Sequence, residues 1–279
     1  MDVVLSHFQV KLLMEGRKAG SAQVAISLDL GLSKAIASLG VEGATLPDGQ
    51  VLNWLDAAKI VKEDRKCFLI REGVPHDIRA FSEQTGWVRS LCPTSGAPTM
   101  LVSGFPMHRI KGTDPMQDTL AKMRALGPIK GRVLDTATGL GYTAIEASRS
   151  CEVVTVELDP EAVEIARLNP WSQKLFDSKR IQMIVGDAAE YVAGQPAGSF
   201  SAVIHDPPTI QFAGELYSLA FYRELKRVLA RSGKLFHYVG DPHSAHGAKV
   251  TGGVVRRLAE AGFKRIERQP EAFGLTAHA

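Results

Sequence analysis

The sequence has few cysteines and no long apolar run, and each shortage excludes a class of protein. The three cysteines, Cys67, Cys92 and Cys151, are odd in number and far apart, and none belongs to a C-x-x-C pair. This argues against a disulfide framework and against a zinc site. No apolar stretch approaches the roughly 20 residues that a membrane helix needs, and no basic segment precedes an apolar one at the N-terminus. We therefore expect a globular, cytoplasmic protein without membrane contact.

Excess charge is also lacking. The formal net charge of +3 over 279 residues is too small to indicate a nucleic-acid partner. The hydrophobic content of 45% is enough for a sizeable core. The length suits a catalytic domain accompanied by a smaller one.

Four short polar stretches are spaced like the strand ends of one sheet. They are residues 135–144, 156–160, 186–188 and 205–209. Each follows a short, mostly apolar run, and the intervals between them leave room for a helix each time. Ligands of such parallel sheets bind at the carboxyl ends of the strands. The spacing predicts an α/β fold with a Rossmann-like sheet of about seven strands.

Residues 1–112 lack this rhythm and predict a small β-rich N-terminal domain. The expected strands are residues 8–14, 23–28, 67–71, 86–91 and 99–103, and the expected helix is 53–61. The second domain, 113–279, begins with a breaker and helix-start residues before a helix over 115–126. Further helices are expected at 160–168, 215–230 and 254–261, and further strands at 234–239, 263–268 and 272–277.

The first polar stretch has the composition of a cofactor loop. Gly139 and Gly141 let the chain turn sharply from strand to helix and approach a ligand closely. With Ala144 they match the G-x-G-x-x-G/A pattern of dinucleotide enzymes, so nicotinamide or flavin binding is one interpretation. Asp135 favours another, because a carboxylate there attracts an ammonium group and repels a pyrophosphate.

Two further carboxylates extend this interpretation. Glu157 ends the second strand, where an acidic side chain accepts hydrogen bonds from both ribose hydroxyls of NAD or of S-adenosylmethionine. Asp187 follows the third strand and suits an adenine amino group, although a helix cap explains it about equally well. Three carboxylates without a nearby cationic anchor favour an adenosyl ligand with an amino-acid tail.

On these residues, the region 115–279 resembles the class I S-adenosylmethionine-dependent methyltransferases. The resemblance implies a seven-stranded methyltransferase sheet and S-adenosyl-L-methionine as the cofactor. It places the methionine part at Asp135 and the glycine loop, the ribose at Glu157, and adenine at Asp187 and Ala188. The implied cofactor-binding residues are Asp135, Thr138, Gly139, Gly141, Tyr142, Thr143, Glu157, Leu158, Gly186, Asp187 and Ala188.

The whole chain also looks like a group of uncharacterised, predicted methyltransferases best known from archaea. The phrases that carry this likeness are SLDLG (27–31), PTMLVSGFPMHRI (98–110), ARLNPWS (166–172), HDPPT (205–209), AGELYS (213–218) and LFHYVGDP (235–242). The likeness implies an architecture and no particular substrate. Trp171, within one of these phrases, is expected either to pack between domains or to cover the cofactor.

The fourth polar stretch predicts an acceptor site. Asp206, Pro207 and Pro208 end the fourth strand, and two prolines stiffen the backbone and leave carbonyls without competing N–H donors. A fixed carboxylate and carbonyl can accept both hydrogens of an amine and aim its lone pair. The motif resembles the Asp/Asn-Pro-Pro-aromatic motif of amino-methyltransferases. Thr209 departs from it, which leaves Phe212 or Tyr217 to supply a ring for a planar substrate.

Histidines gather around the same strand ends. His205 precedes Asp206 and His237 lies on the fifth strand, so adjacent strand ends are expected to bring these two together; His243 and His246 follow. Their spacing matches no metal-ligand pattern, and we expect no metal. A base or substrate-orienting role is one interpretation, and a histidine satisfied within the sheet is the other. The candidate catalytic residues are Asp206, Pro207 and His205.

The sequence therefore predicts an S-adenosylmethionine-dependent methyltransferase acting on nitrogen. Residues 156–159 and 206–229 also resemble spermidine synthases, so aminopropyl transfer is an alternative, although their GGGDG-type loop is absent. A nicotinamide oxidoreductase and a non-catalytic cofactor-binding module stay open. The expected partners are an acceptor amine in a small molecule, a protein or an RNA, and a second copy in a homodimer. Arg223, Arg227 and Arg231 are expected to form a solvated stripe on one helix.

Overall fold

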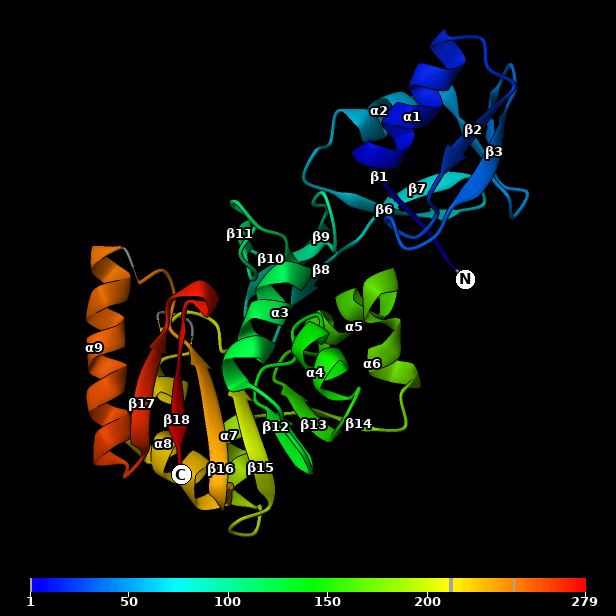
Figure 1. Cartoon of the computed structure of the whole chain (residues 1–279). Coiled ribbons are helices and arrows are strands. Elements are labelled where there is room, and N and C mark those ends of the chain that lie inside the picture. The colour runs from blue at the N-terminus through cyan, green and yellow to red at the C-terminus, as the bar shows by residue number, and fades with distance from the viewer. Residues whose placement is uncertain (1, 211–212, 243) are drawn as a thin grey trace. The chain divides into compact units, whose positions relative to one another are not determined.

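The computed structural model describes residues 2–210, 213–242 and 244–279, and the chain divides into two compact units (Figure 1). The first unit contains residues 1–116 and 161–173, and the second contains 117–160 and 174–279. The first unit thus takes up a segment that lies within the predicted second domain. The predicted boundary at residue 112 stays a prediction.

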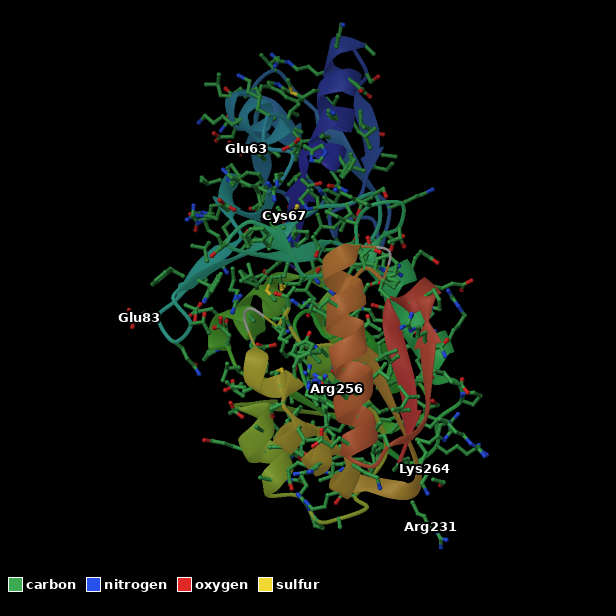
Figure 2. The ribbon with its side chains drawn as sticks, turned by 90° about the vertical axis from the view of Figure 1, so that its left-hand side faces the viewer. Glu63, Cys67, Glu83, Arg231, Arg256 and Lys264 are labelled. Atoms are coloured by element: carbon green, nitrogen blue, oxygen red, sulfur yellow. The ribbon has the colours of Figure 1, made fainter. Side chains whose placement is uncertain are left out.

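The first unit is rich in short strands that form three antiparallel sheets. Their orders are β1-β6-β7, β2-β3-β4-β5 and β11-β10-β9-β8. The strands are β1 Val3–Ser6, β2 Gln23–Ile26, β3 Ala35–Leu39, β4 Gly43–Thr45, β5 Val51–Asn53, β6 Cys67–Arg71, β7 Val74–Asp77, β8 Arg79–Ser82, β9 Trp87–Cys92, β10 Thr99–Val102 and β11 Phe105–Pro106. Glu83 lies in the turn between β8 and β9 and points away from that hairpin (Figure 2).

One expected strand of this unit is wrong, because residues 8–14 belong to helix α1 (His7–Lys18). Ser6 caps the helix and shares a capping box with Gln9, which satisfies backbone donors that a strand would pair differently. Val10 and Leu13 are buried one helical turn apart. The local capping pattern therefore outweighs the β-forming residues of this segment. The predicted helix at 53–61 is confirmed as α2 (Trp54–Val61).

Two of the phrases that carry the archaeal likeness meet inside the first unit. The buried carboxylate of Asp29 accepts hydrogen bonds from the Ser27 and Ser33 hydroxyls, each at 2.6 Å. These bonds hold the turn in which Leu30 adopts a positive φ of 55°. The Trp171 indole then donates to the Leu30 carbonyl at 3.1 Å. Trp171 is thus fixed by the turn of the SLDLG phrase.

The second unit contains a seven-stranded sheet in the order β14-β13-β12-β15-β16-β18-β17. Its strands are β12 Arg132–Asp135, β13 Glu152–Glu157, β14 Ile181–Val185, β15 Phe200–His205, β16 Leu229–Tyr238, β17 Lys264–Gln269 and β18 Gly274–His278. The strands from β14 to β16 pair in parallel, and β18 pairs antiparallel with both of its neighbours. The Rossmann-like sheet predicted from the four polar stretches is confirmed.

Successive residues of the central strands point to opposite faces of this sheet. Leu134, Val154 and Val203 lie in one row and belong to a core cluster with residues of α7 (Ala188–Ala193), α8 (Leu219–Val228) and α9 (Ala245–Glu260). Figure 1 shows α9 alongside β17 at the outer side of the sheet. The alternate residues, Asp135 and Thr155 among them, therefore point to the face opposite this core.

The predicted helices at 115–126 and 160–168 are confirmed as α3 (Pro115–Leu126) and α5 (Pro160–Leu168). α4 (Tyr142–Ala147) follows the glycine loop, and α6 (Gln173–Asp177), which was not predicted, follows the 3-10 turn Pro170–Ser172. The helix predicted over 215–230 is shorter: a 3-10 turn (Gly214–Tyr217) precedes α8, which ends at Val228. Across the described part of the chain, we find no helix with the length and apolarity to cross a membrane.

The expected arginine stripe on one helix face does not form. Arg223 and Arg227 lie on α8, but Arg231 projects from β16 (Figure 2). Arg227 donates to the carbonyls of Gln195 and Val192, at 2.6 and 3.0 Å, and so satisfies the end of α7. Arg227 therefore joins two helices of the second unit.

Candidate functional site

Asp135 ends β12 as a fully buried carboxylate at the carboxyl edge of the sheet. Its Oδ2 atom accepts hydrogen bonds from the Thr143 and Thr155 hydroxyls, at 3.0 and 3.1 Å. No hydrogen bond of ordinary geometry reaches Oδ1 within the described part of the chain. Burial raises the pKa of Asp135 to about 7, against the lowering effect of the Thr143 hydroxyl and with a further increase from nearby Asp206. Such a group favours a cationic ligand that would restore its charge.

The glycine loop joins this carboxylate to the next strand. Gly139 adopts a left-handed φ of 53°, and a Cβ atom added there would meet no atom within 4 Å. Its amide donates to Glu157 Oε2 at 2.8 Å, and the Asp159 amide donates to Oε1 at 3.1 Å. Two backbone amides therefore fix the orientation of the half-buried Glu157 carboxylate beside an open stretch of backbone.

The remaining predicted residues of this loop are structural neighbours of the same carboxylates. Gly141 has a φ of 74°, and an added Cβ would come within 2.7 Å of Leu175, so glycine is needed for packing there. Thr138 and Thr155 hydroxyls lie 2.7 Å apart. Tyr142 and Thr143 are buried in the first turn of α4. These contacts position Asp135 and leave Gly139 as the open part of the loop.

At the next strand ends, apolar and polar groups alternate. Leu158, after Glu157, and Val185, which pairs with Glu157 in the sheet register, are both exposed aliphatic side chains. Gly186 follows, and Asp187 caps α7 by accepting from the Ala189 and Glu190 amides, at 2.6 and 3.0 Å. Ala188 is buried in the first turn of that helix. The cap interpretation of Asp187 is confirmed, and its contact with adenine stays a prediction.

The donor set of this cofactor edge, defined as Asp135, Gly139 and Glu157, fits S-adenosylmethionine. The Asp135 Oδ1 atom suits the ammonium group, the open backbone at Gly139 admits close approach, and Glu157 suits ribose hydroxyls. Exposed aliphatic groups at Leu158 and Val185 suit an adenine ring. The carboxylates make the edge negative, which disfavours the pyrophosphate of a dinucleotide.

Asp206 lies at the neighbouring strand end and forms an ion pair that the sequence did not predict. Lys122 of α3 places its Nζ atom 2.5 Å from Asp206 Oδ2 and 2.9 Å from Asp118 Oδ2. The same Nζ atom lies 4.7 Å from the centroid of the Tyr238 ring. Burial opposes the charge of Lys122, but the Asp206 and Asp118 carboxylates outweigh it and raise the pKa above its usual range. We call Asp206, Asp118, Lys122 and Tyr238 the acceptor edge.

The only sequence signal for Lys122 is its spacing of four residues from Asp118 on the predicted helix, a common pattern of solvated helix pairs. Unlike a solvated helix pair, Lys122 and Asp118 are both buried, with 2% of the Lys122 side chain exposed and none of Asp118. A buried ion pair that reaches a third carboxylate is a strong candidate for a functional group.

His205 and His237 meet as predicted, but on the face opposite Asp135. They pair in the strand register, with ring centroids 4.3 Å apart. His205 Nε2 donates to the Leu216 carbonyl at 2.9 Å, so Nδ1 accepts from the Thr136 hydroxyl at 2.7 Å. Burial lowers the pKa of His205 to about 3. With both nitrogens engaged and no exposed surface, His205 has the geometry of a structural histidine; its catalytic role stays a prediction.

The proline pair is fixed from the same core. Pro207 is buried, and the Tyr217 hydroxyl donates to the Pro208 carbonyl at 3.1 Å. Tyr217 itself is buried against His237, with ring centroids 5.2 Å apart, so its ring is not presented for stacking. Thr209 is exposed. Phe212 and His243 lie outside the described residues, and for His246 only the backbone, in α9, is described.

Sequence comparisons with known proteins identify a methyltransferase domain at the same residues. A family model described as a methyltransferase domain matches residues 133–233, the stretch that carries Asp135, Glu157 and Asp206. The chain belongs to the class I S-adenosylmethionine-dependent methyltransferases. Within them it falls in one family with the uncharacterized protein MJ1233 of Methanocaldococcus jannaschii. The two are 37% identical over 282 residues, which covers 99% of this chain and 96% of the relative.

Aminopropyltransferases are also similar to part of the chain. The polyamine aminopropyltransferase of Mycobacterium tuberculosis is 35% identical over 121 residues, or 40% of this chain and 23% of that enzyme. A crystal structure of spermidine synthase in complex with the transition state analogue AdoDATO has a TM-score of 0.58 at 19% identity. It covers 74% of this chain and 75% of the other. At that identity the likeness shows a shared fold.

Proposed function

We propose that this chain transfers a methyl group from S-adenosylmethionine to a nitrogen atom of an acceptor held at Asp206. The observation that carries the proposal is the meeting of Asp135, Gly139 and Glu157 at one strand edge, close enough to Asp206 for its charge to raise the pKa of Asp135. The methyltransferase-domain match over the same residues supports it.

S-adenosylmethionine, when bound, supplies a methyl group that is already activated by the sulfonium. The protein then has to hold and orient the two reactants, which is the proximity contribution to catalysis. Asp135 binds the ammonium group and Glu157 the ribose hydroxyls. Asp206 would accept a hydrogen bond from the acceptor N–H and aim the nitrogen lone pair at the methyl carbon. The carbon–sulfur bond would break as the carbon–nitrogen bond forms, S-adenosylhomocysteine would leave, and the proton of the nitrogen would pass to solvent.

His205 acts as a positioning residue in this proposal. Its bonds to Thr136 and to the Leu216 carbonyl tie the loop after β12 to the segment before α8. Burial keeps the imidazole neutral above about pH 3, so its titration would not enter a pH–rate profile between pH 5 and 8. A bell-shaped profile that disappears in His205→Gln would contradict this assignment.

Aminopropyl transfer is the second candidate, favoured by the likeness to polyamine aminopropyltransferases over 40% of the chain. Asp135 would suit the ammonium group of decarboxylated S-adenosylmethionine equally well. The cofactor edge alone therefore does not separate the two reactions.

Isothermal titration calorimetry with S-adenosylmethionine, its decarboxylated form and NAD separates these candidates. We expect S-adenosylmethionine to bind at least about tenfold more tightly than either of the others. Absence of S-adenosylmethionine binding would overturn the proposal, and tighter binding of the decarboxylated form would favour aminopropyl transfer. Incubation of the protein with methyl-labelled cofactor and fractionated RNA, protein or small-molecule extracts then identifies the acceptor class.

A further inference from the structure

The buried lysine of the acceptor edge is itself an alkylammonium ligand of that edge. Lys122 brings a four-carbon stem and an ammonium group from α3, and only 2% of its side chain is exposed. The ammonium lies between the carboxylates of Asp118 and Asp206, at 2.9 and 2.5 Å. The Tyr238 ring lies beneath it at 4.7 Å. All four groups belong to the second unit.

Two carboxylates and an aromatic ring are the groups by which proteins recognise a protonated alkylamine. In this chain that recognition is already satisfied from within, because a lysine side chain is a butylammonium group tethered to the backbone. A protonated amine entering at Asp206 would have to share this carboxylate with Lys122. The Lys122 ammonium already occupies the position between the two carboxylates, so a second ammonium group cannot take the same place.

We propose that Lys122 is a specificity-determining residue that fills the ammonium position of the acceptor edge. The nitrogen that reaches Asp206 is therefore uncharged, as in an amide or a heteroaromatic amine, and protonated alkylamines such as diamines are kept out. The inference rests on the proposed function in one respect, the assignment of Asp206 to the acceptor. It separates this chain from the polyamine aminopropyltransferases that it resembles in part.

Removal of Lys122 tests the inference without any methyl transfer. Lys122→Ala vacates the ammonium position and leaves both carboxylates and the ring, whereas Lys122→Gln removes the charge and keeps most of the volume. Arg124→Ala is the matched control, because it removes an exposed cation from the same helix. Butylamine and diaminobutane are titrated into each protein by calorimetry in the absence of S-adenosylmethionine, and thermal unfolding is followed with and without amine.

We expect Lys122→Ala to bind butylamine with a dissociation constant of about 1 mM. The amine should also raise the stability of this variant, because it fills the space left by the lysine side chain in the folded state. Lys122→Gln should bind diaminobutane at least about fivefold more tightly than wild type does. Wild type and Arg124→Ala should bind neither amine in this range. A purely structural lysine would destabilise the variants without creating amine binding.

Lys122→Gln decides the outcome if Lys122→Ala does not fold. Amine binding by wild type, or equal affinities of wild type and Lys122→Gln for diaminobutane, would overturn the inference. Because these titrations contain no cofactor, their failure leaves the proposed function standing. Failure of S-adenosylmethionine to bind wild type would overturn that function whatever the amine result.

Discussion

The cofactor edge and the acceptor edge lie on neighbouring strand ends of one sheet but are built differently. At the cofactor edge, hydroxyls donate to Asp135 and backbone amides donate to Glu157. At the acceptor edge, Asp206 is paired with a buried lysine. The buried Asp135 carboxylate would gain from a cationic ligand, whereas the Asp206 carboxylate already has an ammonium partner within the chain. Similar carboxylates at one edge of a sheet therefore differ in whether a cation of the chain accompanies them.

The largest expected effect separates the two edges by turnover. Asp206→Ala should lower methyl transfer about 1,000-fold, because the acceptor nitrogen loses its orienting group, and change S-adenosylmethionine affinity by less than about twofold. Incorporation of labelled methyl groups and calorimetry measure the two quantities. Asp177→Ala, an exposed aspartate at the end of α6, serves as the control. Normal turnover in Asp206→Ala would show that this residue does not hold the acceptor.

The converse variant removes the cofactor edge. Glu157→Ala should weaken S-adenosylmethionine binding about 100-fold, since a carboxylate that accepts two ribose hydroxyls contributes charge-assisted hydrogen bonds. Calorimetry measures the affinity. Glu152→Ala changes an exposed glutamate at the other end of β13 and should leave the affinity unchanged. If Glu157→Ala and Glu152→Ala bound S-adenosylmethionine with equal affinity, Glu157 would not be the residue that recognises the ribose.

Another effect concerns stability and its dependence on pH. The pKa of Asp135 rises from 3.8 to about 7 on folding, chiefly because of burial. Between about pH 4 and 7 the unfolded chain loses this proton while the folded protein keeps it, so the free energy of unfolding decreases as pH rises. Asp135→Asn removes this contribution and should stabilise the protein by up to about 4 kcal/mol at pH 8, at about 1.4 kcal/mol for each unit of pKa.

Urea unfolding at pH 5 and pH 8 measures this difference. The same Asn variant should bind S-adenosylmethionine more weakly, because an amide does not balance an ammonium group. Asp177→Asn, at an exposed position, should change neither quantity. A pH dependence of unfolding that is the same in Asp135→Asn and wild type would show that Asp135 is not the titrating group.

The smallest effect separates a helix cap from a ligand contact. Asp187→Ala should lower the free energy of unfolding by about 1 kcal/mol through loss of the α7 cap, whereas Asp187→Asn keeps a capping oxygen and should be nearly neutral. If Asp187 also contacts adenine, both variants weaken S-adenosylmethionine binding, by about fivefold. Unchanged affinity in both would make Asp187 a cap alone. Unfolding curves and calorimetry on the same samples distinguish these results.

Much of the cofactor edge could be predicted because its groups follow strands directly. Apolar runs and glycine turns place Asp135, Gly139 and Glu157 at the carboxyl edge, since parallel strands of similar length end together. The prediction of a strand over 8–14 was wrong, because the capping box of Ser6 and Gln9 starts a helix there. The prediction of an arginine stripe was wrong, because α8 ends at Val228 and Arg231 lies beyond it.

The acceptor edge was less predictable, for two physical reasons. His205 and Asp206 are adjacent in sequence, but side chains of a strand alternate between faces, so His205 points into the core with His237. Lys122 and Asp206 are 84 residues apart and meet through the packing of α3 on the strand end. The spacing of four residues between Asp118 and Lys122 indicates neither that Lys122 is buried nor that it reaches Asp206.

By itself, the sequence determined the alternation of strands and helices in the region 115–279 and the carboxylates that end its strands, because local periodicity and turn residues encode both. It also carried the likeness to the methyltransferases. Only the tertiary structure decided which carboxylate stays available for a cation and which is neutralised. Charge balance depends on burial and on partners brought from distant helices, and Lys122 shows this most directly.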